Sequence, residues 1–216
     1  MTSTPTPFRL PRFYPILDTT MLSDCGCGMI PAAKGLLEAE VKILQYRHKD
    51  HWTQAHFDQA QQIASLCHEC GVLFVLNDRA DFARLLGAAL HVGQDDLPPI
   101  AARRIISDEV IGFSTHDELQ LTRADEEPVE YLSLGPIFAT NSKSKPDLVV
   151  GIDGLHRLRA LTQKPLAAIG GITLENARDV LDAGADSVAV ISGLLVDARD
   201  RITVRRKAEE WVRLTA

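Results

Sequence analysis

The chain has 216 residues, of which 45% are hydrophobic and 24% are charged, and its formal net charge is −6. This length and composition can bury the core of one globular domain, which excludes a disordered protein. The acidic balance gives no general attraction for nucleic acid, and no run of eighteen apolar residues is present to cross a membrane. Any bound anion must therefore be held by a local cluster of basic residues.

The first twelve residues, Met1–Arg12, are rich in Thr and Pro and contain no apolar core. They are expected to form a flexible arm and not a signal peptide, which leaves a cytoplasmic location as the default. No linker, internal repeat or low-complexity stretch divides the remaining chain. Residues 13–216 are therefore expected to form a single domain.

Short apolar or β-branched runs alternate with amphipathic stretches along the whole of that domain, which is typical of parallel β-α-β units. The expected strands are Phe13–Leu17, Val41–Tyr46, Leu73–Leu76, Ala89–Val92, Val110–Phe113, Tyr131–Leu134, Leu166–Ile169 and Ser187–Val190. Eight such units in succession favour an α/β fold of the closed TIM (β/α)8 barrel type over an open doubly wound sheet, which stays the alternative. In such a barrel the reactive residues follow the carboxyl ends of the strands.

Three of the intervening segments carry helix signals of their own. Trp52–Glu69 places its apolar residues on one face. Thr173 is expected to cap a helix over Leu174–Ala183, and a last helix is expected over Val204–Leu214. These helices would cover the outside of the barrel.

The four cysteines fall in two close pairs, Cys25 with Cys27 and Cys67 with Cys70. Paired cysteines are typical of zinc sites. The expected fold, however, places the first pair in a loop at one end of the barrel and the second late on a helix that runs toward the other end. Free thiols in a reducing compartment are therefore the preferred interpretation. The sequence assigns no function to the loop around Cys25.

A basic cluster follows the second expected strand. Gln45, Arg47 and Lys49 alternate along an extended segment, so their side chains are expected to share a direction toward the barrel axis. Two cations and an amide converging there would form an anion cradle, in which Arg can bind phosphate oxygens with two hydrogen bonds. The alternative is a solvated charged loop.

Acidic residues follow the third and fourth strands. Asn77 and Asp78 come after one, and Asp95 and Asp96 after the other. Each aspartate could merely cap the next helix. Beside a basic cradle, however, carboxylates at neighbouring strand ends favour a hard cation that bridges to phosphate, and Mg²⁺ typically takes one or two carboxylates plus phosphate oxygens.

Two further strand ends carry hydroxyl groups. Ser114, Thr115 and His116 come at the carboxyl end of strand five. The two hydroxyl groups could bind a polar ring or diphosphate and His116 could move protons, or the hydroxyl pair could merely cap the next helix. Strand six is followed by a long loop that contains Thr140 and Ser142 and ends in Lys143. This loop is interpreted as a mobile flap that brings one more cation to a phosphate, with a plain surface loop as the alternative.

The last two strands run into Gly170-Gly171 and Ile191-Ser192-Gly193. Backbone N–H groups after strands seven and eight commonly bind a phosphate in β/α barrels, and glycine permits the close approach. The strand ends therefore predict two anion sites, a metal–diphosphate site and a backbone-built monophosphate site. An enzyme with both would join a phosphorylated acceptor to a group carried on diphosphate.

The sequence resembles the thiamine-phosphate synthase family from Phe13 onward. The motifs that carry the resemblance are Gln45-Tyr46-Arg47-His48-Lys49, Leu76-Asn77-Asp78, His91-Val92-Gly93-Gln94-Asp95-Asp96, Gly135-Pro136-Ile137-Phe138, Ile169-Gly170-Gly171-Ile172 and Val190-Ile191-Ser192-Gly193. The resemblance implies condensation of hydroxymethylpyrimidine diphosphate with a thiazole phosphate, to give thiamine phosphate and pyrophosphate. It also implies a dissociative, Mg²⁺-assisted mechanism, in which diphosphate leaves and the thiazole nitrogen captures the pyrimidine methyl cation.

The resemblance assigns roles residue by residue. It implies that Asp78 and Asp96 bind Mg²⁺ and that Ser114 lies near the pyrimidine. The residues implied to hold the diphosphate are Gln45, Arg47, Lys49, Asn77 and Lys143, and those implied to line the thiazole phosphate pocket are Thr140, Gly171, Ile191 and Ser192. Arg47, Lys49 and Lys143 would neutralise the leaving group. The family flap usually reads Thr-x-Thr-Lys, whereas Ser142 stands here in place of the second Thr.

Two other functions stay open. A thiazole tautomerase on the same scaffold would use His116 as acid and base and would not need the metal carboxylates. A non-catalytic barrel that binds thiamine precursors would be expected to lose charged strand-end residues, and none is lost here. The sequence predicts small-molecule partners and leaves the oligomeric state open, a homo-oligomer included.

Overall fold

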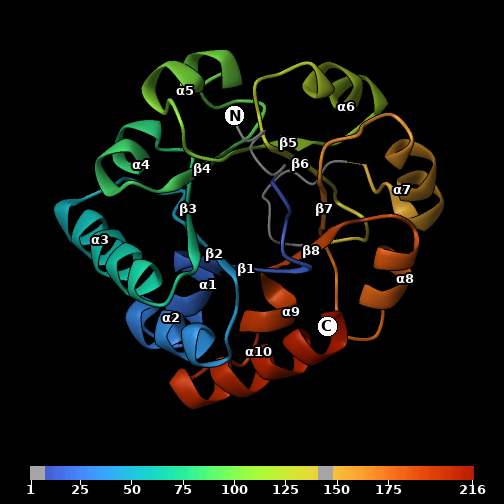
Figure 1. Cartoon of the computed structure of the whole chain (residues 1–216). Coiled ribbons are helices and arrows are strands. Elements are labelled where there is room, and N and C mark those ends of the chain that lie inside the picture. Colours follow the sequence, from blue (N-terminus) through green and yellow to red (C-terminus); the bar gives the residue numbers. More distant parts are fainter. Residues whose placement is uncertain (1–7, 141–147) are drawn as a thin grey trace, which may run out of the picture.

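The computed structural model describes residues 8–140 and 148–216, and its parallel strands follow one another around a closed barrel in the order β1 to β8 (Figure 1). The strands are β1 Phe13–Asp18, β2 Ile43–Arg47, β3 Leu73–Asn77, β4 Ala89–Val92, β5 Ile111–Thr115, β6 Tyr131–Leu134, β7 Leu166–Ile169 and β8 Ser187–Val190. Strand β1 pairs with β8 as well as with β2. The predicted TIM (β/α)8 barrel is therefore confirmed, and the open sheet is excluded.

Four strands, β1, β2, β3 and β5, differ from their expected bounds, and the two largest differences, of two residues each, have local reasons. Strand β2 begins at Ile43 because the Val41 N–H still donates to the Leu36 carbonyl, at 3.4 Å, in the turn that closes the preceding helix. Strand β5 continues to Thr115 because Ser114 and Thr115 pair with β6. Ser114 therefore lies on the strand itself and not in the loop after it.

Helices surround the barrel on its outer side (Figure 1). They are α1 Thr19–Asp24, α2 Met29–Glu38, α3 Gln54–Glu69, α4 Ala80–Leu86, α5 Pro99–Ile105, α6 Glu118–Asp125, α7 Gly151–Arg159, α8 Ala177–Asp182, α9 Ser192–Leu195 and α10 Arg201–Thr215. Within the two described ranges, none combines the length and the apolar character that a membrane span requires.

The expected cap of helix α8 is wrong. Its N-cap is Asn176, not Thr173, and the helix begins at Ala177. The Asn176 Oδ1 accepts from the Thr173 N–H at 2.8 Å, and the Asn176 N–H donates back to the Thr173 carbonyl at 3.3 Å. The turn from Thr173 to Asn176 therefore lies before the helix.

Alternate residues of the strands face the barrel axis and form an inner apolar cluster, distinct from the larger core between strands and helices. Tyr14 and Tyr131 are the large inner side chains, 1% and 0% exposed. Of the expected arm 1–12, residues 8–12 are described. Leu10 belongs to the inner cluster, and the Phe8 ring lies 6.0 Å from that of Tyr131.

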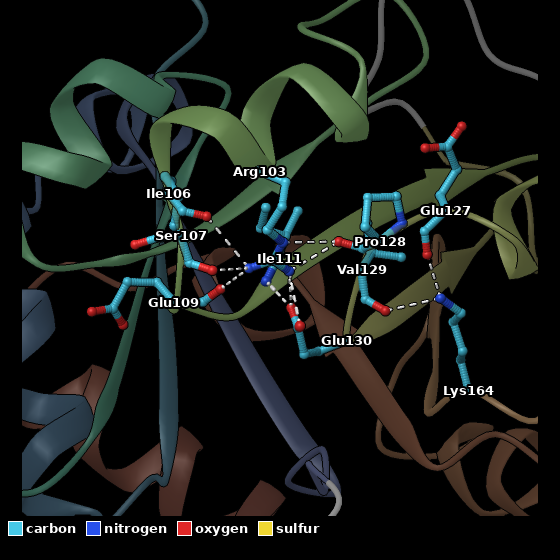
Figure 2. Close-up of polar contacts among 10 residues, drawn as sticks. All are labelled: Arg103, Ile106, Ser107, Glu109, Ile111, Glu127, Pro128, Val129, Glu130 and Lys164. Atoms are coloured by element: carbon cyan, nitrogen blue, oxygen red, sulfur yellow. Dashed lines mark hydrogen bonds and ion pairs between the residues drawn. The ribbon is translucent and has the colours of Figure 1, made fainter.

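The strand-start end of the barrel is tied together by two cations (Figure 2). Arg103 on α5 donates to both carboxylate oxygens of Glu130, at 2.8 and 2.7 Å, and to the Pro128 carbonyl at 2.9 Å. The same Glu130 accepts from the Ile111 N–H at 2.7 Å. Lys164 donates to two more carbonyls of the β6 approach, at 2.5 and 3.0 Å. These bonds fix the approaches to β5, β6 and β7 from the end opposite the expected site.

All four cysteines are free thiols. Cys67 is buried on α3, where burial raises the pKa of its thiol to about 12. Cys25 follows α1, and its thiol contacts the Leu195 carbonyl on α9 at 3.4 Å. Residues 8–140 and 148–216 hold no group of three or more His, Cys, Asp or Glu side chains that could bind a metal.

Candidate active site

The expected basic cluster lies at the carboxyl end of β2, but its members do not form one free cradle. The Gln45 amide points inward and donates to the Tyr14 hydroxyl at 2.7 Å. Arg47 forms an ion pair with Asp18, the last residue of β1 and its partner in the strand register. Lys49 reaches across to the β3 loop, where its Nζ lies 2.6 Å from an oxygen of Asp78. Each cation is thus already paired with a carboxylate.

The two predicted metal ligands lie together under that lysine. Lys49 Nζ is 2.6 Å from Asp78 and 4.0 Å from Asp96, so one ammonium group bridges the loops after β3 and β4. Asp78 has a left-handed backbone, with φ of 66°, and its N–H donates to the His91 carbonyl at 2.8 Å. The Gly93 N–H donates to Asp96 at 2.7 Å and fixes the direction of that carboxylate.

The two carboxylates affect each other's protonation. Burial and the hydrogen bond with Asp96 raise the pKa of Asp78 to about 6, against the opposing effect of Lys49. Burial would also raise the pKa of Asp96, but its hydrogen bonds with Asp78 and with the Gly93 N–H hold that pKa below the ordinary value. Above the range where Asp78 titrates, two negative charges therefore lie side by side with one exposed lysine.

This arrangement fits a magnesium ion that is completed by a substrate. Mg²⁺ is typically bound through one or two carboxylates, with the remaining positions taken by waters and phosphate oxygens. Asp78 and Asp96 supply two carboxylates within reach of the same Lys49 ammonium group. Beside them, Asn77 is 5% exposed, and its side-chain NH₂ has no hydrogen-bond partner among the described residues. A buried donor of this kind suits a bound anion.

Ser114 lies at the end of β5, next to β4 and the loop that carries Asp96. Its Oγ is 2.8 Å from His91 Nε2 and 3.2 Å from the Ser133 hydroxyl, and its carbonyl accepts from the Gln94 amide at 2.6 Å. His116 lies one loop further on, where its Nδ1 donates to the Gly135 carbonyl at 2.6 Å. That bond assigns one ring nitrogen of His116 to the backbone.

The loops after β6, β7 and β8 pack on one another. The Phe138 N–H donates to the Gly170 carbonyl at 3.0 Å, and a Cβ on Gly171, whose φ is +64°, would lie 2.7 Å from the Ala139 carbonyl. This contact brings the segment that leads to Thr140 against Gly171. Ile191 and Ser192 open the short helix α9 at the same end of the barrel. The predicted flap residues Ser142 and Lys143 lie outside the described residues.

Three groups that contact predicted site residues, directly or through one intervening side chain, are not predicted from the sequence. Asp18 follows an apolar run, as do the other strand-end residues, and a survey that included strand one would have found it. His91 lies inside a motif that carries the resemblance, yet only its neighbours receive a role there. Tyr131 gives no signal in the sequence, because an aromatic residue on a strand is typical of any core.

Known proteins resemble this chain in sequence and in fold. The model of the family described as thiamine monophosphate synthase matches residues 13–194. The thiamine-phosphate synthase of Koribacter versatilis is 49% identical over 89% of this chain and 93% of its own length, and that of Chloroflexus aurantiacus is 36% identical over 90% and 92%.

A solved structure titled thiamine phosphate pyrophosphorylase, from Pyrococcus furiosus, superposes with a TM-score of 0.83 and 29% identity, covering 95% of each chain. The family match spans every strand of the barrel and all the predicted site residues that the structure describes. The chain therefore belongs to the thiamine monophosphate synthase family.

Proposed function

We propose that this chain is a transferase that condenses hydroxymethylpyrimidine diphosphate with hydroxyethylthiazole phosphate, giving thiamine phosphate and pyrophosphate. The observation that carries the proposal is the bridge of Lys49 between Asp78 and Asp96 at the ends of β3 and β4. Family membership and the names of the full-length relatives support the choice of substrates.

The residues around that bridge suit departure of a diphosphate. Arg47 and Lys49 can exchange their carboxylate partners for phosphate oxygens, which bind guanidinium and ammonium groups strongly. The Asn77 NH₂ group would add a neutral donor. Mg²⁺, bound by Asp78 and Asp96, would supply charge neutralisation on the leaving group. Lys143 is proposed as one more cation there, on the strength of the resemblance.

The acceptor would bind at the opposite side of the barrel mouth. Backbone N–H groups near Gly171, Ile191 and Ser192, with the Thr140 hydroxyl and the flap residue Ser142, are proposed to hold the thiazole phosphate. The support is that Gly171 closes onto the β6 loop, which shapes one edge of such a pocket. The attacking ring nitrogen has no proton to lose, so no general base is needed.

The proposal is tested with the purified protein and both substrates, with and without Mg²⁺. Thiamine phosphate is expected only when Mg²⁺ is present, and turnover that survives chelation would remove the metal from the mechanism. Lys49→Ala and Asp96→Ala should each slow condensation by at least about tenfold, or about 1.4 kcal/mol. Lys34→Ala, on the outer helix α2, is the control and should leave the rate unchanged.

The same assay tests the alternative function, that of a thiazole tautomerase. It requires isomerisation of the thiazole phosphate alone and an essential His116. The Gly135 carbonyl engages Nδ1 of that residue, and the carboxylate pair has no task in a proton transfer of this kind. Isomerisation without condensation would replace the proposed function.

A further inference from the structure

A continuous chain of hydrogen bonds runs through the barrel interior. Gln45 Nε2 donates to the Tyr14 hydroxyl at 2.7 Å, which lies 2.8 Å from the Tyr131 hydroxyl. The Tyr131 hydroxyl lies 2.9 Å from His91 Nδ1, and His91 Nε2 lies 2.8 Å from Ser114 Oγ. The chain crosses strands β2, β1, β6, β4 and β5 in that order. It therefore joins two site residues that no strand pairing connects.

The donors in this chain can be ordered from its first member. An amide NH₂ only donates, so the Tyr14 oxygen accepts from Gln45 and its own proton goes to Tyr131. Tyr131 then accepts from Tyr14 and donates to His91 Nδ1. An imidazole that accepts at Nδ1 carries its proton on Nε2, and that proton is donated to Ser114.

The surrounding packing holds the members of the chain in place. The ring of His91 is stacked on that of Tyr131, with centroids 5.5 Å apart and an angle of 28°. Gly112 makes room for this arrangement, since a Cβ there would lie 2.0 Å from the Tyr131 ring. Burial raises the pKa of the Tyr14 and Tyr131 hydroxyls above the ordinary value, so both keep their protons. Phenylalanine would fill the same space without burying polar groups.

We propose that Tyr14, Tyr131 and His91 are positioning residues that hold the Ser114 hydroxyl as a donor to a ring nitrogen of the pyrimidine substrate. The His91 Nε2–H occupies one lone pair of Ser114 Oγ, and the Ser133 hydroxyl, 3.2 Å away, can donate to the other, which leaves the Ser114 proton for an acceptor on the ligand. Ser114 is only half-buried and can reach a ligand, whereas the residues behind it are buried. The identity of the ligand rests on the proposed function, but the donor order does not.

The donor order is tested without any substrate. Nitrogen-15 NMR of the histidine-labelled protein reports which imidazole nitrogen carries the proton, and His91→Gln identifies the His91 signals. The wild type should show Nε2 protonated and Nδ1 unprotonated. Tyr131→Phe should move His91 away from that single tautomer, because it removes the proton donated to Nδ1. A wild-type His91 protonated on Nδ1, or a tautomer unchanged in Tyr131→Phe, overturns the donor order.

The effect on the substrate is tested by kinetics. Tyr131→Phe should raise the KM for the pyrimidine diphosphate about fivefold or more, as expected for a misdirected hydrogen bond. The KM for the thiazole phosphate should stay unchanged. Tyr46→Phe is the matched control, because its buried hydroxyl donates to Gln59 on α3, outside the barrel. Equal changes in both KM values, or no change in either, would show that the chain of hydrogen bonds has only a structural role. A wild type without condensation activity would refute the proposed function and leave the NMR result standing.

Discussion

The carboxylate pair leads to a prediction about stability that needs no substrate. Asp78→Asn replaces a half-buried ionisable group by a neutral one of the same shape. Asn tolerates the left-handed backbone of this position, whose φ is 66°, so the change adds no conformational strain. Because burial and Asp96 raise the pKa of Asp78 to about 6, folding of the metal-free wild type disfavours its ionised form.

The sign and size of the effect follow from linkage. A carboxyl whose pKa is higher in the folded than in the unfolded state makes the protein less stable as pH rises from about 4 to about 6. A rise from 3.8 to about 6 corresponds to about 3 kcal/mol. The lowered pKa of Asp96 offsets part of this, so Asp78→Asn should be about 1–2 kcal/mol more stable than the wild type at pH 7.

The assay is urea unfolding between pH 4 and pH 8 in the presence of a chelator. The advantage of Asp78→Asn should grow with pH, and Mg²⁺ should reduce it by stabilising only the wild type. Asp81→Asn is the control, since its hydrogen bond to Arg79 lowers the pKa of Asp81 and removal should destabilise slightly above pH 4. An advantage for Asp78→Asn that is missing at pH 7, or equal at all pH values, would refute the reasoning.

Two further predictions concern other parts of the barrel. Arg103→Lys should destabilise the fold by about 2–3 kcal/mol in urea unfolding, because it loses the paired bonds to Glu130 and bonds to backbone carbonyls. Arg157→Lys, in an exposed ion pair, should change stability by less than about 0.5 kcal/mol. Gly171→Ala should raise the KM for thiazole phosphate about tenfold, since its Cβ would displace the β6 loop. Gly26→Ala has a similar φ but open space, and should leave that KM unchanged.

The sequence predicts the barrel because each strand is a short apolar run between helices, and parallel strands buried on both faces need such runs. It predicts less well where a strand turns polar. Strand β5 was expected to stop at Phe113 but continues through Ser114 and Thr115, which pair with β6. Polar residues at the carboxyl end of a strand are interpreted from the sequence as part of the following loop, although in a barrel these positions line the site. The predicted cap Thr173 is wrong for a different reason. Thr173 and Asn176 are both good capping residues, and the helix begins after the second of them.

For the site, the sequence predicts which residues lie at the strand ends but not how they pair. The alternation predicts that Arg47 and Lys49 converge as free cations, whereas each contacts a carboxylate at a neighbouring strand end, Arg47 on β1 and Lys49 after β3. Those contacts depend on the stagger between strands, which residue types alone do not determine. The contact between Tyr14 and Tyr131 is still harder to predict from the sequence, because β1 and β6 are not neighbours in the sheet and meet only across the closed barrel.

The pairing explains how an acidic protein can hold a diphosphate. Asp18, Asp78 and Asp96 outnumber Arg47 and Lys49, so the described part of the site carries no positive excess when all five groups are ionised. A polyanion would be repelled from such a site unless further positive charge accompanied it. The carboxylates therefore serve ligand binding only if they hold a cation, and the raised pKa of Asp78 indicates that the pair is unfavourable without one. If the proposed function holds, the residues that make the metal-free site electrostatically unfavourable also make its affinity for diphosphate conditional on Mg²⁺.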